Sequence, residues 1–210
     1  EAGIEVGNYT DIAVDDNGFV HIVCNNWREL LGGTVFYLTN KNGNWEHEVV
    51  VSSYDPSIAV DSSGYVHIAH SKIFDYWNNI NHLQYSTNES GSWVHTTIDW
   101  DETTGWDSDI KIDSSGKIHI SYYNYLFLTG TARYATNKSG SWVWEEIAGE
   151  DQHEGQSTSI ALDSNEDPYM THYAYESETL LLSEKESDVW TTEILDTGTT
   201  YTIKDMAVDY

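Results

Sequence analysis

The segment Asp11-Ile-Ala-Val-Asp-Asp-Asn-Gly-Phe-Val-His-Ile22 is the first of several related copies along the chain. The next copies begin at Ser57 (Ser-Ile-Ala-Val-Asp-Ser-Ser-Gly-Tyr-Val-His-Ile) and at Asp109 (Asp-Ile-Lys-Ile-Asp-Ser-Ser-Gly-Lys-Ile-His-Ile). A more divergent copy begins at Ser159, and a fifth begins at Asp205 with Asp-Met-Ala-Val-Asp. One block that returns about every 50 residues indicates tandem structural modules.

A second block follows each of the first four copies and ends in tryptophan. It runs from Tyr37 to Trp45, Tyr85 to Trp93, Tyr134 to Trp142 and Leu182 to Trp190. The first three copies read Tyr-x-Thr-Asn-x-x-Gly-x-Trp. Because the two blocks recur together, each repeat is expected to fold as one supersecondary unit.

Each repeat contains four short runs rich in Val, Ile, Tyr, Trp and Thr. In the first repeat these runs are 11–15, 19–25, 34–39 and 45–51, with turn residues between them. Such runs favour strands, and glycine in the short connections favours tight hairpins. Four antiparallel strands in each repeat predict an all-β fold, a β-propeller of four-stranded blades.

The predicted propeller is a single domain over residues 1–210. Its repeats are 8–53, 54–105, 106–156 and 157–201, and a partial blade combines 1–7 with 202–210. This arrangement favours five blades, the fifth lacking its middle strands, or a segment of a larger ring. An incomplete blade exposes strand edges, which pair readily with additional chain or with another copy.

The Ile-x-Val-Asp-x-x-Gly-x-Val-His-Ile block resembles blades of the NHL and Asp-box type found in secreted bacterial propellers. The resemblance covers nearly the whole chain and implies the propeller fold. It implies no single activity, because many unrelated functions use that fold.

Composition excludes several classes of function. The chain of 210 residues carries 9 Lys and Arg against 35 Asp and Glu, which gives a formal net charge of −26. This charge argues against nucleic-acid binding and against docking on anionic membranes. Cys24 is the single cysteine, so the chain cannot form an internal disulfide. High acidity and the near absence of cysteine favour a secreted or cell-surface protein.

The conserved positions of the repeat are expected to be structural. His21, His67 and His119 share one position, and we expect them to bond the repeat aspartate or a neighbouring backbone rather than a metal, since equivalent residues of successive blades lie about 10 Å apart. The repeat aspartates are expected to accept backbone N–H bonds in turns. The repeat tryptophans are expected to pack between blades, and Cys24 to be a packing residue.

The connections between repeats, in contrast, vary and are expected to carry function on one face. The binding candidates there are aromatic residues and carboxylates: Trp27, Tyr76, Trp77, Trp100, Trp106, Tyr125, Asp11, Asp109 and Asp205. Aromatic rings stack on sugars, and carboxylates accept bonds from hydroxyl groups. Clustered oxygen ligands make Asp99, Asp101, Asp107, Glu150 and Asp151 weak calcium candidates, although their spacing matches no defined calcium loop.

Three functions remain open from the sequence. The first is a non-catalytic extracellular module that binds glycans. The second is a structural or adhesive propeller that pairs through its incomplete blade. The third is a glycosidase-like enzyme using carboxylates such as Asp11, Asp109 and Asp205 at the channel mouth. A sialidase is disfavoured, because Arg28 and Arg133 are the only arginines and cannot form a three-arginine carboxylate site. No catalytic residue and no cofactor is assigned.

Overall fold

The computed structural model describes residues 7–26, 33–75, 80–125, 130–147 and 154–198. Its described residues form four antiparallel sheets of four strands, which we number as blades in chain order. Blade 1 consists of β1 (Asn8–Val14), β2 (Val20–Asn26), β3 (Thr34–Thr39) and β4 (Glu46–Val51). Blade 2 consists of β5 (Tyr54–Val60), β6 (Val66–Asp75), β7 (Ile80–Thr87) and β8 (Val94–Asp99).

Blades 3 and 4 repeat the same up-and-down order. Blade 3 consists of β9 (Thr104–Ile112), β10 (Ile118–Tyr125), β11 (Gly130–Thr136) and β12 (Val143–Glu146). Blade 4 consists of β13 (Glu154–Leu162), β14 (Pro168–Ala174), β15 (Thr179–Glu186) and β16 (Val189–Thr197). Among these residues, no helix has the length and apolarity needed to cross a membrane.

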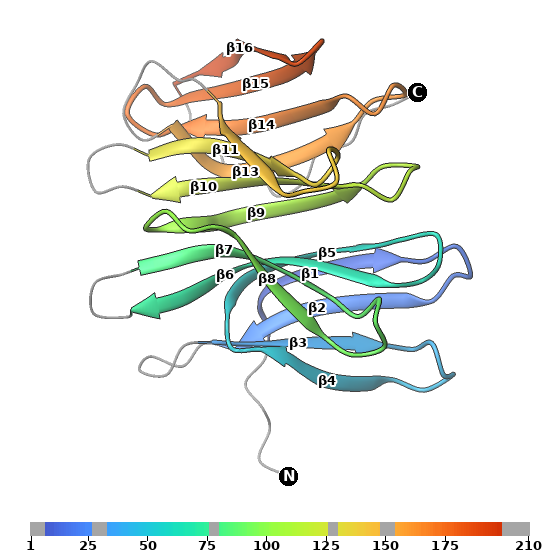
Figure 1. Ribbon diagram of the computed structural model, residues 1–210. Coiled ribbons are helices and arrows are strands. Elements are labelled where there is room, and N and C mark those ends of the chain that lie inside the picture. Colours follow the sequence, from blue (N-terminus) through green and yellow to red (C-terminus); the bar gives the residue numbers. More distant parts are fainter. Residues whose placement is uncertain (1–6, 27–32, 76–79, 126–129, 148–153, 199–210) are drawn as a thin grey trace.

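The first strands of the blades lie side by side around the centre of the molecule. β1 packs on β5, β5 on β9 and β9 on β13, while the last strand of each blade lies outermost (Figure 1). This arrangement confirms the predicted all-β propeller of four-stranded blades. The strands of the first repeat also agree with their predicted ranges to within about three residues.

The hydrophobic core lies between neighbouring blades. One cluster joins Val23, Val35 and Tyr37 of blade 1 to Ile58 and Ile68 of blade 2. Corresponding clusters join blade 2 to blade 3 and blade 3 to blade 4. A blade therefore buries its apolar faces only when it has a neighbour, as expected of a repeat architecture.

Repeat aspartates stabilise the first hairpin of each blade. One oxygen of Asp15 accepts the N–H groups of Asn17 and Phe19 at 2.9 and 2.8 Å, and Asp61, Asp113 and Asp163 make the corresponding bonds. Gly18 and Gly64 adopt positive φ of 82° and 80°, which glycine reaches without strain. The predicted turn-forming role of the aspartates is confirmed.

Each repeat histidine is buried and lies between the turn aspartate and a tyrosine of its own blade. In blade 1, Nδ1 of His21 lies 2.6 Å from the Tyr37 hydroxyl, and Nε2 lies 3.5 Å from Asp15. His67 and His119 have the same partners in blades 2 and 3. Burial is the main cause that lowers the pKa of all three imidazoles. The contact with the aspartate was predicted, and of these three histidines only His119 makes it as a hydrogen bond, whereas the tyrosine partner was not predicted.

The repeat tryptophans pack across the blade interfaces. Trp93 contacts Tyr37 edge-on with ring centroids 5.6 Å apart, Trp142 contacts Tyr85, and Trp190 contacts Tyr134. In each pair the tryptophan belongs to one blade and the tyrosine to the blade before it. The same tyrosine therefore bonds its histidine and supports the next blade, which confirms the predicted packing role for these three tryptophans.

Candidate functional site

The start of each first strand lies at the end of the propeller that is predicted to form the channel mouth. There Tyr9, Asp55, Asp107 and Ser157 take equivalent places with φ of 46–53°, beside irregularities in strand register. We call these four residues the mouth residues. A positive φ is uncommon for non-glycine residues, so its recurrence in every described blade indicates a bend of the inner strand that belongs to the repeat.

Mouth residues of successive blades are linked to one another. The N–H of Ser157 donates to Oδ2 of Asp107 at 2.9 Å, and the Asp55 carboxylate accepts the N–H of Asp107. Ser108 and Thr158 donate through their hydroxyl groups to the carbonyl oxygens of Asp55 and Asp107. The bend therefore joins the blades at the mouth.

Asp55 is the electrostatically unusual member of this group. It is buried, and its Oδ1 has no hydrogen-bond partner among the described residues. Burial first and then the charge of Asp107 raise the pKa of Asp55 to about 7, and the hydrogen bond from the Asp107 backbone offsets only part of that rise. The charge of Asp55 is in turn the main cause that raises the pKa of Tyr9. At neutral pH a fraction of Asp55 is protonated and can donate a proton.

The predicted mouth carboxylates Asp11 and Asp109 lie two residues further along their strands and clasp the next blade. Oδ2 of Asp11 accepts the Ile58 N–H at 2.8 Å, and Oδ2 of Asp109 accepts the Ile160 N–H at 2.9 Å. Asp109 also accepts the Ser159 hydroxyl and pairs with Lys111. Burial raises the pKa of Asp11 more than its backbone bonds lower it. These oxygens already have structural partners.

An exposed aromatic group lies at the same end of blade 2 as Asp55. Phe74 near the end of β6, His82 in β7 and Trp100 just after β8 contact one another, with ring centroids 4.5–6.0 Å apart. Phe74 and Trp100 are exposed, whereas His82 is buried and its Nδ1 lies 2.9 Å from the Asp101 carbonyl oxygen. We call these three residues the aromatic platform.

Tyr125 and Trp106, also predicted to bind ligand, are placed in blade 3. Tyr125 at the end of β10 contacts the buried ring of Tyr123 edge-on at 6.2 Å. Trp106 is opposite Tyr123 in the β9–β10 ladder, and its buried indole N–H has no partner among the described residues. Gln156 of the next blade acts on Tyr123 by lowering its pKa, although burial raises that pKa to about 12. Both candidates therefore flank the mouth rather than join the aromatic platform.

The calcium candidates Asp99, which is buried, and Asp101, which is exposed, both pair with the buried Arg133. The Arg133 guanidinium contacts Oδ2 of Asp99 at 2.8 Å and Oδ2 of Asp101 at 2.9 Å, and Arg133 stacks 4.2 Å over the Trp144 ring. Asp99 also accepts the Tyr122 hydroxyl. Asp107 is used at the mouth. Across the described ranges no group of three or more His, Cys, Asp or Glu side chains is placed to hold a metal ion. The calcium site stays a prediction.

Several candidates lie outside the described residues: Trp27, Tyr76, Trp77, Asp205, Glu150 and Asp151. Sequence reasoning passed over Tyr9, Asp55 and His82. The sequence does contain a pattern that points to Asp55: it stands two residues before Ser57, just as Asp107 stands two residues before Asp109. No repeat pattern points to His82, since the other repeats have no histidine at the equivalent position.

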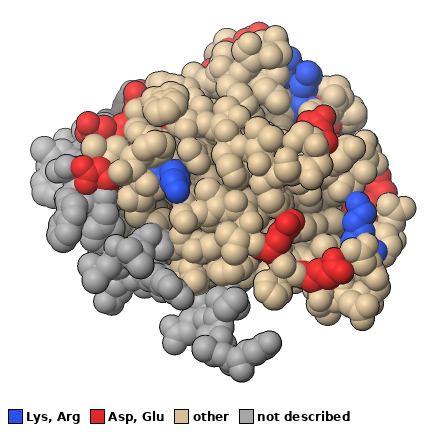
Figure 2. Space-filling view, turned by 60° about the horizontal axis from the view of Figure 1, so that its bottom comes forward, with Lys and Arg blue, Asp and Glu red and all other residues tan. Residues whose placement is uncertain are grey.

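Surface charge is uneven. In the view of Figure 2 a group of acidic side chains lies at the left, others are scattered, and basic side chains are sparse. The left is also the side at which β6 ends and β7 begins in Figure 1. Carboxylates also flank the aromatic platform in the sequence, since Asp75 follows Phe74 and Asp101 follows Trp100.

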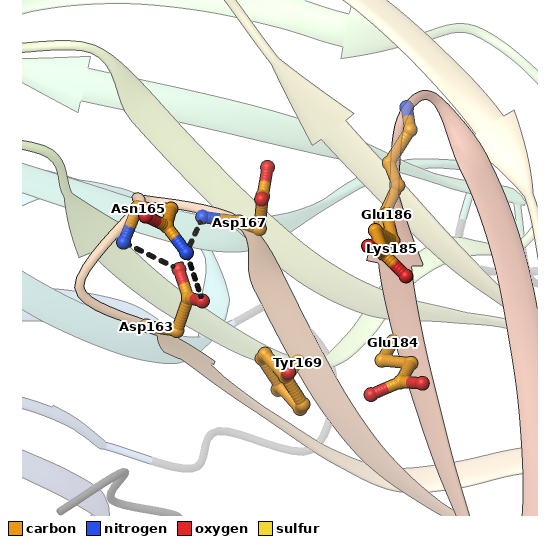
Figure 3. Close-up of a pocket in the computed structure, with 7 residues that line it drawn as sticks. All are labelled: Asp163, Asn165, Asp167, Tyr169, Glu184, Lys185 and Glu186. Carbon is orange, nitrogen blue, oxygen red and sulfur yellow. Dashed lines mark hydrogen bonds between the residues drawn. The ribbon is translucent and has the colours of Figure 1, made fainter. Parts of the chain in front are cut away.

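A shallow cavity of about 250 Å³ lies at the opposite end of blade 4. Asp163, Asn165, Asp167, Tyr169, Glu184, Lys185 and Glu186 line it (Figure 3). Here Tyr169 and Leu182 replace the histidine and tyrosine of the other blades. Asp163 is occupied by bonds to Asn165 and Asp167, and Lys185 pairs with Glu145. The cavity thus lies where the His–Tyr pair of the other blades is lost, and two of its charged side chains, Asp163 and Lys185, are engaged within the protein.

Inner-strand clasps, histidine–tyrosine pairs and tryptophan interfaces define a β-propeller repeat protein with an aromatic and acidic face. No family model matches the sequence, and no curated protein matches it. The resemblance to NHL and Asp-box blades therefore stays a prediction.

Solved propeller-like structures share the fold. The family 117 glycoside hydrolase Zg3597 of the marine bacterium Zobellia galactanivorans superposes with a TM-score of 0.60 at 15% identity, over 91% of this chain and 70% of that one. A xylan β-1,4-xylosidase of Bacillus halodurans C-125 gives 0.53 at 16%, over 96% and 45%. A Trypanosoma rangeli sialidase gives 0.58 at 8%, over 88% and 37%. The chain thus spans less than half of the last two proteins.

Proposed function

We propose that this propeller binds a saccharide on the face that carries the aromatic platform and the mouth residues. The observation that carries the proposal is the contact group of Phe74, His82 and Trp100, because two of its rings are exposed while the third holds them in place. Exposed rings backed by a buried polar contact offer a rigid surface for the apolar face of a sugar.

Carboxylates around the platform supply the polar half of the site. Asp101 is exposed beside Trp100, and the buried Asp55 lies at the same end of blade 2. Their oxygens accept hydrogen bonds from sugar hydroxyl groups. Carbohydrate-active propellers among the structural neighbours support this class of ligand.

The charge of the chain favours an uncharged saccharide. A formal net charge of −26 repels sulfated or uronate-containing polymers, and Arg133 is buried between Asp99 and Asp101 rather than open to an anion. We therefore propose a neutral polysaccharide as ligand.

Affinity electrophoresis tests this proposal with gels that contain xylan, agarose or a sulfated polysaccharide. Retardation by a neutral polymer is expected, and Trp100→Ala or Phe74→Ala should weaken it up to about tenfold, since loss of one stacking ring removes about 0.5–1.5 kcal/mol. Trp45→Ala is the matched control, because Trp45 is similarly exposed but lies near the opposite end of its blade. The proposal fails if no neutral polymer retards the protein, or if both platform variants bind like the wild type.

Hydrolysis of the bound glycan is a second candidate function, which Asp55 favours. Its pKa of about 7 suits a general acid at neutral pH, and Asp107 is a second carboxylate in the same group. Glycoside hydrolysis uses such a pair, one protonated and one ionised. A purely structural mouth bend explains the backbone links, but it does not require a buried carboxylate with a free oxygen.

Reducing-end release from xylan and hydrolysis of nitrophenyl glycosides test the catalytic candidate. Activity should fall at least 100-fold in Asp55→Asn. Asp109→Asn serves as the comparison, because its effect should follow stability alone. A fully active Asp55→Asn variant, or a wild type with no activity on any substrate it binds, excludes this role.

We also propose an extracellular or cell-surface location. The strongly acidic composition supports it. Immunodetection in culture supernatant and on intact cells of the native organism tests the location, and a signal confined to lysates contradicts it.

A further inference from the structure

Blade 1 presents a face that every other described blade covers with its predecessor. Ile12 is 61% exposed, whereas the equivalent Ile58, Ile110 and Ile160 are 5%, 1% and 0% exposed. Val14 on the same strand is also exposed, and alternate residues of a strand share a face. The exposed face therefore belongs to the framework of the repeat rather than to a ligand site.

Trp45 shows the same loss of a neighbour. Its equivalents Trp93, Trp142 and Trp190 each pack on an aromatic ring of the preceding blade, but Trp45 is 58% exposed. Ile12, Val14 and Trp45 together form what we call the open face of blade 1. Large apolar side chains gathered on one face of a soluble protein indicate an interaction surface.

The contacts between the inner strands of the other blades show which side chains cover the equivalent face. The preceding blade contributes an aspartate oxygen to the isoleucine N–H, as Asp11 does to Ile58 and Asp109 to Ile160. It also contributes a small side chain two residues later: Ala13 packs on the cluster containing Ile58, and Ala59 on the cluster containing Ile110. In blade 1 the Ile12 N–H instead bonds the side chain of Asp11 at 2.8 Å.

The sequence 205–209 has these features. It reads Asp-Met-Ala-Val-Asp, with aspartate at the clasp position and Ala207 at the packing position. Asp205 follows the end of β16 by 8 residues, and the corresponding steps in the described connections are 6, 10 and 13 residues (Val51–Ser57, Asp99–Asp109, Glu146–Ser159). The segment thus has the composition and the reach of a fifth inner strand.

We propose that residues 205–209 dock as an inner strand against the open face of blade 1, with Asp205 accepting the Ile12 N–H and Ala207 packing on Ile12 and Val14. The contact places the last copy of the repeat beside the first and begins a fifth blade. It involves neither the aromatic platform nor the mouth residues of blade 2, so it stands independently of the proposed saccharide site.

Thermal unfolding of the full chain tests the contact. Ile12→Ser should lower Tm by about 5 °C, because it removes an apolar side chain that the docked strand would cover. Ile194→Ser is the matched control, since Ile194 is 64% exposed on the outer strand β16 and should shift Tm by about 1 °C or less. Equal, small shifts for the two variants overturn the proposal.

A double-mutant cycle identifies the occupant. Ala207→Lys should lower Tm by about as much as Ile12→Ser does. The double variant should lose little more in Tm than either single variant, because both changes break the same contact. Thr200→Lys, which lies outside the repeat block, should leave Tm unchanged. Additive effects contradict docking by 205–209. A Tm loss from Ile12→Ser that depends on protein concentration and is independent of Ala207 assigns the face to a second copy and also contradicts the proposal.

Discussion

The indole of Trp142 packs on the ring of Tyr85 in the preceding blade, with the ring centroids 5.1 Å apart. The same tyrosine hydroxyl lies 2.5 Å from Nδ1 of His67, and burial raises the pKa of Tyr85 to about 12. One tyrosine thereby connects the hairpin of its own blade to the outer strands of the next. This relationship couples the packing of neighbouring blades.

Trp142→Ala should lower the free energy of unfolding by about 2–3 kcal/mol, because it opens a cavity on Tyr85 at the interface of blades 2 and 3. The same change at the exposed Trp45 should cost less than about 1 kcal/mol in any state in which the open face is uncovered. Urea denaturation measures both values. Equal costs would contradict the contact with Tyr85 as the source of the loss.

Asp109→Ala should destabilise the protein by about 1–3 kcal/mol, because the buried Ile160 N–H loses its acceptor. Ser57→Ala is the matched control at the equivalent place of blade 2, where the Ser57 hydroxyl has no partner among the described residues. That variant should differ from wild type by less than about 0.5 kcal/mol. Similar losses in both would contradict the clasp as the origin of the effect.

Arg133→Met should cost about 3–5 kcal/mol, because it leaves the Asp99 carboxylate buried without its cation. The Asp99→Asn change should recover part of this loss when combined with Arg133→Met, since it removes the unpaired charge. Denaturation of both single variants and the double variant measures the coupling. Strictly additive losses would show that the buried ion pair is not the source.

The buried His70 is expected to make the stability of the fold sensitive to acid. Its imidazole lies between the hydroxyl groups of Ser53 and Ser86 at 2.7 Å from each, and burial lowers its pKa from 6.5 to about 3. Because the unfolded state takes up a proton that the folded state refuses, stability falls as the pH drops below about 6.5. The loss between pH 6.5 and pH 4 should reach about 3 kcal/mol from this residue alone.

Unfolding free energies measured across this pH range for wild type and His70→Gln test the prediction. The variant is expected to be less stable at pH 7 but to show a shallower slope below pH 6.5. His172, whose pKa burial lowers to about 4, contributes a further slope of the same sign that remains in the variant. Parallel profiles would exclude His70 as the acid-sensitive group.

The buried Asp55 is expected to give the stability of the fold the opposite pH dependence. Its folded pKa of about 7 lies above the ordinary value of 3.8, so the folded state binds a proton that the unfolded state releases. The contribution of Asp55 to stability is therefore greatest below about pH 4 and is lost as the pH rises to about 7. Relative to wild type, Asp55→Asn should gain about 4 kcal/mol between pH 4 and pH 8. A pH-independent difference would show that Asp55 titrates normally.

Much of the fold follows from local pattern. Glycine in the hairpins, alternating apolar residues and the spacing of the repeat aspartates define strands and turns through interactions that span a few residues. The blade pattern, the turn role of Asp15 and its relatives, and the packing of Trp93, Trp142 and Trp190 were therefore predictable from the amino-acid sequence.

The site depended on contacts between repeats that no local pattern encodes. Asp109 looked like a mouth carboxylate but bonds the next blade, because neighbouring inner strands bring the Ile160 N–H to its oxygen. Asp55 looked ordinary, yet the packed blades remove it from water and place it near Asp107, which raises its pKa. Periodicity predicts which residues are equivalent, whereas burial and charge at each position depend on the neighbouring blade, and so only the assembled structure distinguishes Ile12 from Ile58 or Asp55 from its equivalents.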